Sequence, residues 1–159
     1  MTRSPETIVI IPTLHTADHL LDACLESLEE HTDGDVVSIV CEGGSFGENV
    51  NAGAANFPEA RYYMLLNEDT VVGHGWLPPL LLAAHHHHII GCRLIYPDNR
   101  LQHAGVYLDF QDGILTAHNH LTEQPPGPVE AVTGAAMLVD GELWRELDGM
   151  DLNYQSGYE

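Results

Sequence analysis

Lysine is absent from this chain of 159 residues, which has five arginines and a total of 24 aspartates and glutamates. The formal net charge is therefore −19 with histidine neutral. A surface this acidic repels nucleic acids and anionic lipids, so we expect no nucleic acid as a partner. The absence of lysine also suggests a halophilic protein, because high salt screens the self-repulsion. An ordinary acidic protein is the alternative.

Cysteines and long apolar runs are also scarce. Cys24, Cys41 and Cys92 are far apart and each lies in an apolar stretch, which predicts buried, reduced thiols rather than a disulfide framework. No apolar run reaches the ~20 residues that a membrane-spanning helix needs. The N-terminus lacks the apolar core of a signal peptide. We therefore expect no transmembrane segment and a cytoplasmic location.

The first half of the chain alternates predicted strands with predicted helices. Apolar runs predict strands at Thr7–Ile11, Val36–Cys41 and Tyr62–Leu66. A helix capped by Thr16 or Asp18 follows the first strand and stops at Asp33-Gly34, and two more helices are expected at Phe46–Asn56 and Trp76–Ala84. The order strand, helix, strand favours a right-handed crossover and a parallel sheet.

The pattern changes near Gly91, after which hairpins and loops dominate. The expected elements are an extended stretch at Ile89–Tyr96, a hairpin of Val106–Phe110 and Ile114–His118, a strand at Ala136–Val139 and a helix at Glu142–Leu147. The join has no linker composition. We therefore predict one domain over residues 1–159, with a nucleotide-binding half at 1–90 and an acceptor-side half at 91–159.

The strongest local signal is Asn67-Glu68-Asp69, directly after the strand predicted at Tyr62–Leu66. In an open α/β sheet, ligands bind at the carboxyl ends of the strands. Carboxylates at such a position need a cation or hydrogen-bond donors. A hard divalent metal held here could bridge two phosphates of a ligand that the acidic surface would otherwise repel. A plain polar turn is the alternative.

The same stretch, continued through Thr70 to Leu77, resembles the "N-D-D-T…G-W-L" segment of inverting family 2 glycosyltransferases, in particular rhamnosyltransferases. Further segments follow in the order of that family. They are Val9–Thr13 ("I-P-T"), Phe46–Gly53 ("G-F…N-x-G"), Tyr96–Gly105 ("Y-P-D-G-x-L-Q-H-A-G") and Val132–Leu138 ("V-T-G-A-x-M-L") with Gly157-Tyr158-Glu159 ("G-Y-E-D"). The resemblance extends over nearly the whole chain.

The resemblance implies an α/β protein of GT-A (Rossmann-like) fold, with a mostly parallel sheet flanked by helices and a C-terminal half rich in hairpins and loops. It implies transfer of a sugar, with inversion, from a nucleoside diphosphate sugar to a glycan or lipid-linked acceptor. It also implies a divalent metal cofactor, manganese or magnesium. The metal-binding position of the family is occupied here by Asp69. The positions implied for donor binding are Pro12, Thr13, Glu42, Asn51, Asn67, Glu68, Gly134 and Ala135.

Two residues are implied as catalytic. Glu159 takes the place of the first acid of the "E-D" pair that holds the family's general base, and His103 lies on the acceptor side. The second acid of that pair would follow Glu159. Three alternatives are therefore open: the chain is a fragment, Glu159 itself is the base, or the protein is a non-catalytic nucleotide-sugar-binding module. An acidic metal-binding scaffold is a further alternative.

The remaining histidines form two groups. His85–His88 are consecutive, so their side chains diverge and cannot share one metal ion, and a solvated helix end is expected. His118 and His120 alternate on one face of a predicted strand. They could bind a metal with a third ligand, although an ordinary surface strand is favoured.

Overall fold

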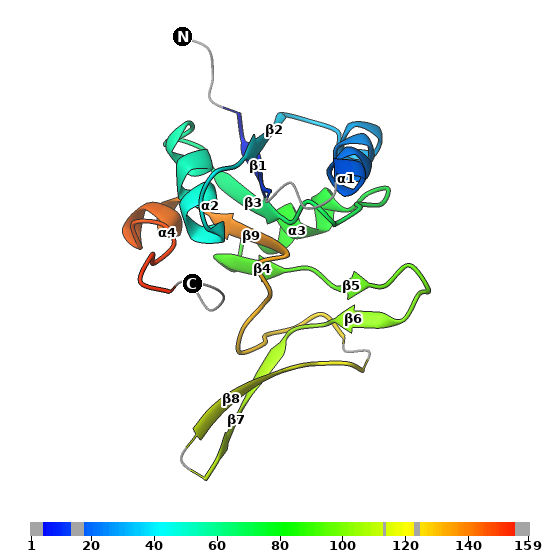
Figure 1. Ribbon diagram of the computed structural model, residues 1–159, viewed down its shortest axis with the longest axis vertical. Helices are drawn as coiled ribbons and strands as arrows, with labels where there is room; N and C mark the ends of the chain where they lie inside the picture. The colour runs from blue at the N-terminus through cyan, green and yellow to red at the C-terminus, as the bar shows by residue number, and fades with distance from the viewer. Residues whose placement is uncertain (1–4, 14–17, 113, 123–124, 155–159) are drawn as a thin grey trace.

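The computed structural model describes residues 5–13, 18–112, 114–122 and 125–154, and its centre is a five-stranded sheet with helices on both faces (Figure 1). The strand order is β2-β1-β3-β9-β4. The strands are β1 (Thr7–Pro12), β2 (Val36–Cys41), β3 (Tyr62–Leu66), β4 (Ile89–Gly91) and β9 (Ala136–Asp140). This arrangement confirms the prediction of an α/β protein.

Alternation along the central strands divides the core into two layers. Every residue of β1 and β3 is buried, as expected of strands covered on both faces. Val9 and Ile11 contact one cluster of apolar side chains, whereas Ile8 and Ile10 contact the other. Because successive side chains of a strand point to opposite faces, a single apolar run supplies both layers.

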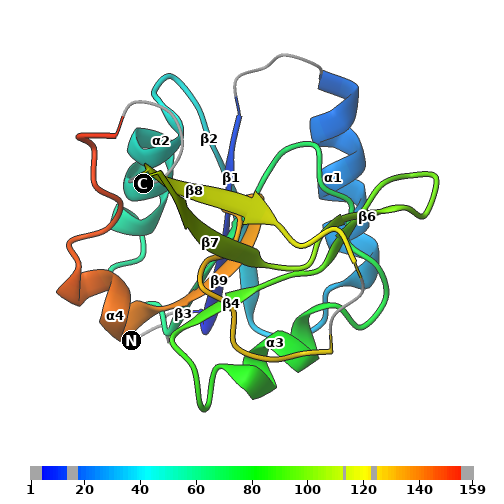
Figure 2. The same ribbon diagram turned by 90° about the horizontal axis from the view of Figure 1, so that it is seen from below.

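Each layer is completed by a pair of helices (Figure 2). On one face, α1 (Asp18–His31) buries Cys24 and Leu28, and α3 (Leu77–Ala83) packs beside it. On the other face lie α2 (Phe46–Ala55) and α4 (Gly141–Glu146), which contributes Trp144. The predicted helices are thus present, with ends that differ by a few residues.

The sheet is mixed, which corrects the prediction of a mostly parallel sheet. β1 pairs in parallel with β2 and β3, but β9 pairs antiparallel with both β3 and β4. The physical reason lies in residues 92–135, which leave and re-enter the sheet at the same edge. Cys92 N lies 3.1 Å from Ala136 O, so the end of β4 adjoins the start of β9. β9 therefore runs in the direction opposite to β4 and to β3, between which it lies.

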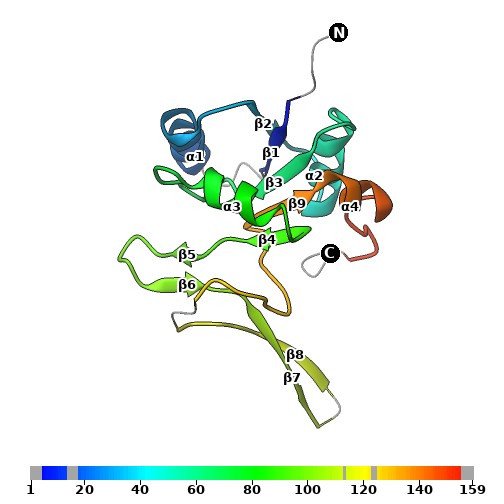
Figure 3. The same cartoon turned by 180° about the vertical axis from the view of Figure 1, so that it is seen from behind.

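Residues 92–135 contain two further two-stranded sheets that project away from the central sheet (Figures 1 and 3). They are formed by β5 (Leu94–Ile95) with β6 (Leu101–His103) and by β7 (Val106–Gln111) with β8 (Ile114–Asn119). The predicted hairpin is confirmed, whereas the extended stretch Ile89–Tyr96 is two strands in different sheets. The helices of the described ranges are all too short or too polar to span a membrane.

The two predicted halves are not spatially separate, since β9 and α4 return to the central sheet from the C-terminal half. Their assignment to donor and acceptor stays a prediction.

Candidate functional site

The ends of three neighbouring strands lie together along one end of the central sheet. β1 and β3 are parallel and end there at Pro12 and Leu66, while the antiparallel β9 begins there at Ala136. The residues just outside these strands are consequently neighbours. Asn67 N donates to Ala135 O at 2.9 Å, which ties the start of the Asn67-Glu68-Asp69 segment to the residue before β9. We call this the carboxyl edge of the sheet.

Thr13 and Glu68 are joined across the carboxyl edge, although 55 residues separate them in the chain. The buried Thr13 hydroxyl donates to a Glu68 carboxylate oxygen. Thr13 N donates to Cys41 O at 2.9 Å, so the same residue also links the ends of β1 and β2. Of the residues predicted for donor binding, Thr13, Asn67, Glu68 and Ala135 are therefore brought together by hydrogen bonds along one edge.

The turn that carries Asp69 is held on both sides. Thr70 N donates to Asn67 O at 3.1 Å, and the Thr70 hydroxyl lies 3.5 Å from Ala135 O. Beyond the turn, Val72 N donates to Ser27 Oγ of α1 at 3.1 Å in a buried position. Asp69 itself is exposed, and no residue of the described ranges bonds its carboxylate. The backbone of the turn is therefore held in place, while the Asp69 carboxylate faces the solvent.

The pKa of the Cys24 thiol, on α1, is affected by the negative charge of this turn. Burial first, and then the negative charges of Asp69 and Glu68, together raise the pKa of its thiol to about 11. The thiol lies 3.8 Å from Asn67 O. A thiolate is thus disfavoured beside these carboxylates, whereas a cation would be favoured there.

The loop after β2 is ordered by α2. The side chain of the buried Asn49 accepts from Gly44 N and donates to Gly44 O, both at 3.1 Å. Ser45 and Glu48 form a capping box, in which the Ser45 backbone N–H lowers the pKa of Glu48. The N-terminus of α2 is therefore already occupied by a carboxylate of its own chain. Glu42, predicted to contact the base, is exposed at the start of this loop.

Gly134 lies against α2, whereas Asn51 of α2 contacts the segment after α4. A Cβ at Gly134 would lie 3.1 Å from the Phe46 ring, so this glycine allows the turn before β9 to approach α2. Both polar atoms of the Asn51 side chain bond the Met150 backbone: Oδ1 accepts from Met150 N at 2.8 Å, and Nδ2 donates to Met150 O at 3.0 Å. Its implied role in donor binding stays a prediction.

The two predicted catalytic residues have no observed position at the carboxyl edge. Glu159 lies outside the described residues. His103 is buried on β6, opposite Leu94 in a separate two-stranded sheet. Its Nδ1 lies 3.0 Å from Asn119 Oδ1 of β8, and its buried Nε2 has no hydrogen-bond partner among the described residues. Asn119 was not predicted, because only the packing of the hairpin against β6 brings it to His103.

The histidine groups fit their ordinary interpretations. His85–His88 are exposed after α3, as predicted for a solvated helix end. The rings of His118 and His120 flank Tyr107, with centroids 5.1 Å and 5.0 Å away. Within the described ranges, no three residues of the metal-binding types His, Cys, Asp and Glu are grouped to hold a metal ion.

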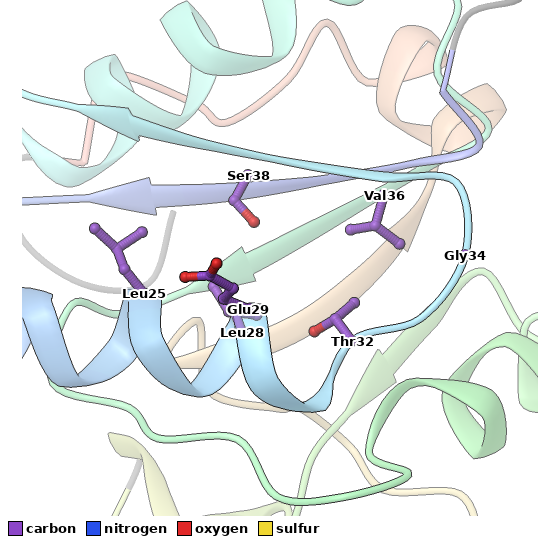
Figure 4. A pocket seen from close by; sticks show the side chains of 7 residues that line it. All are labelled: Leu25, Leu28, Glu29, Thr32, Gly34, Val36 and Ser38. Carbon is purple, nitrogen blue, oxygen red and sulfur yellow. The ribbon is translucent and has the colours of Figure 1, made fainter.

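A pocket of about 360 Å³ lies away from the carboxyl edge (Figure 4). It is formed by α1 and the first half of β2. The side chains of Leu25, Leu28 and Glu29 lie on one side of it and those of Val36 and Ser38 on the other. Because ligands of open α/β sheets bind at the carboxyl ends of strands, this pocket is not the expected nucleotide site.

Comparison with known proteins gives a relative in sequence and a likeness in fold. The O-antigen biosynthesis protein RfbC of Myxococcus xanthus is 27% identical over 123 residues, which cover 67% of this chain and 9% of that protein. The crystal structure of A197 from STIV matches with a TM-score of 0.57, over 89% of this chain and 68% of that chain. At 14% identity it shows the fold alone. No family model matches the chain.

Proposed function

We propose that the carboxyl edge binds a nucleoside diphosphate sugar through a divalent cation on Asp69, and that the domain is a GT-A glycosyltransferase of the inverting family 2 type. The observation that carries the proposal is the convergence of Thr13, Asn67, Glu68 and Ala135 around the solvent-facing carboxylate of Asp69. Such a cluster at the carboxyl end of parallel strands is where open α/β sheets bind their ligands.

Charge supports a cation at Asp69. With a net charge of −19, the protein repels a free diphosphate, and the capped N-terminus of α2 already holds the Glu48 carboxylate. Oxygen ligands suit Mg²⁺ and Mn²⁺, and Mg²⁺ is commonly held by one or two carboxylates with water and substrate phosphates. A single exposed aspartate therefore fits a metal that arrives with the nucleotide. Bound there, the metal would stabilise the charge of the departing diphosphate.

The residues of this chain would position the donor. The Thr13–Glu68 hydrogen bond joins the segments that follow β1 and β3. The Asn67–Ala135 bond holds the turn that carries Asp69. Gly134 packs against the Phe46 ring, and the resemblance implies that donor and acceptor meet at Gly134 and Ala135. The proton of the acceptor hydroxyl would pass to a carboxylate, for which the resemblance implies Glu159.

The similarity to an O-antigen biosynthesis protein supports a role in glycan synthesis. A glycan or lipid-linked acceptor follows only from the resemblance. Since the chain spans 9% of that protein, the donor, acceptor and stereochemistry are parts of the proposal. The alternative of a metal-binding scaffold lacks a specific observation in its favour. A binding module without turnover would share the donor site and would differ only in transfer.

Isothermal titration with UDP, GDP and dTDP, each with and without MnCl₂, tests the donor site. We expect Asp69→Asn to weaken metal-dependent binding of the preferred nucleotide by about tenfold or more, because it removes the charged ligand. The control Asp22→Asn removes an equal charge from the exposed face of α1 and should bind as the parent does. Equal binding by Asp69→Asn and the parent would refute the site.

A further inference from the structure

β2 forms one edge of the central sheet, and its register shows which backbone groups face outward. Thr7 N donates to Asp35 O, and Thr13 N donates to Cys41 O, so odd-numbered residues of this segment face β1. Because backbone groups alternate in direction along a strand, the N–H and C=O of Val36, Ser38 and Val40 point away from the sheet. Within the described ranges no strand pairs with this outer edge of β2.

The outer edge of β2 lacks the features that normally prevent strand addition. Edge strands in natural proteins are usually short, charged, interrupted by proline or bulged. β2 has six residues, Val-Val-Ser-Ile-Val-Cys, without a charge or proline, and Val40 is 40% exposed. The opposite edge, β4, has only three residues. β2 is therefore the edge that can accept a further strand.

The pocket between α1 and β2 lies beside this edge (Figure 4). Leu25, Leu28 and Val36 give it an apolar wall, and the exposed Glu29 provides a carboxylate at its rim. A strand added to β2 sends alternate side chains over the α1 face. An apolar wall with a carboxylate at the rim suits a lysine or arginine, whose methylene stem packs while its charged head pairs.

Charge also distinguishes between the possible occupants. Asp33 and Asp35 precede β2, and Glu42 follows it. In an antiparallel pair of two β2 strands, Glu42 of one copy would lie near Asp33 and Asp35 of the other, and like charges facing each other across strands are destabilising. The chain has no lysine to offset them. A basic partner strand therefore fits this edge, whereas a second copy of the chain does not.

We propose that the outer edge of β2 binds an extended polypeptide segment that carries a lysine or arginine. Its main chain pairs with Val36, Ser38 and Val40, and its basic side chain enters the α1–β2 pocket toward Glu29. Strand addition of this kind derives affinity from main-chain hydrogen bonds and specificity from pockets for alternate side chains. The site is independent of the proposed nucleotide site, because it uses neither Asp69 nor any other residue placed there.

Fluorescence anisotropy tests the proposal with a labelled peptide of alternating valine and threonine that has arginine at its centre. The full chain should bind it, and Glu29→Gln should weaken binding about fivefold, the value of a well-placed exposed ion pair. Glu26→Gln, on the same helix outside the pocket, removes an equal charge and should have no comparable effect. The peptide with glutamate at its centre should not bind.

Main-chain pairing is tested separately. Ser38→Pro removes an outward N–H without removing a bond to β1, and should weaken binding about tenfold or more, whereas Ser38→Ala should bind as the parent does. Should Ser38→Pro fail to fold, the arginine peptide with N-methylated valines gives the same test on the unaltered protein. Three results would overturn the proposal: no binding of the arginine peptide, equal binding of the N-methylated peptide, or equal affinity in Glu29→Gln. Sedimentation showing a dimer that Ser38→Pro dissociates would overturn it in favour of a second copy.

Discussion

The Asn51 side chain provides a test that separates structure from donor binding. Its Oδ1 accepts from Met150 N at 2.8 Å, and its Nδ2 donates to Met150 O at 3.0 Å. These two bonds join α2 to the segment after α4, across 99 positions in the chain. Neutral hydrogen bonds each contribute about 1 kcal/mol, so we expect Asn51→Ala to lower the free energy of unfolding by about 2 kcal/mol.

The expected change is large enough to measure by thermal and urea denaturation followed by circular dichroism. For a domain of this size, 1 kcal/mol shifts the Tm by roughly 2–4 °C, so Asn51→Ala should melt about 4–8 °C below the parent. The control is Asn56→Ala, because Asn56 makes one exposed bond, to Ala52 O. That variant should stay within about 0.5 kcal/mol of the parent.

A second variant tests whether the bridge itself is responsible. Gly149 has φ 82°, and a Cβ there would lie 2.5 Å from Asn51 Oδ1. Gly149→Ala should therefore destabilise the protein through backbone strain and through displacement of the Asn51 amide. The double variant should lose less stability than the sum of the losses in Asn51→Ala and Gly149→Ala, because both substitutions disrupt the same contact. An Asn51→Ala variant with unchanged Tm but weakened nucleotide binding would refute this reasoning and favour the donor role.

Two further predictions concern charge. Because the folded-state pKa of Cys24 is raised to about 11, its contribution to stability should be complete below about pH 8.5, the usual thiol pKa, and be lost as the pH rises through about 11. This pKa can be measured from the ultraviolet absorbance of the thiolate in a variant in which serine replaces Cys41 and Cys92. MnCl₂ should lower the pKa of Cys24, because a cation near Asp69 would favour the thiolate. An unchanged pKa in MnCl₂ would argue against a cation beside Asp69. The net charge of −19 predicts a Tm that rises with potassium chloride into the molar range, and a flat or falling Tm would remove the halophilic hypothesis.

Elements with a strong local pattern were predictable from the sequence. The apolar runs of β1, β2 and β3 and the leucines along one face of α1 are properties of neighbouring residues, so their periodicity appears in the chain itself. The position of Asn67-Glu68-Asp69 after a buried strand was predictable in the same way, whereas its role as a ligand site stays a prediction. β5 and β6 are two and three residues long, which is too short for such a pattern.

The contacts that define the candidate site came from tertiary structure. The sequence determined that Thr13 and Glu68 each follow a strand, but not that the strands are adjacent. It supplied a conspicuous His103 without its neighbour Asn119, and an Asn51 without Met150. A local pattern determines the period and the buried face of an element, whereas the choice of partner depends on how distant elements share one core. The direction of β9 shows this most clearly: its apolar run predicts a strand, and only the return of residues 92–135 to the same edge makes it antiparallel.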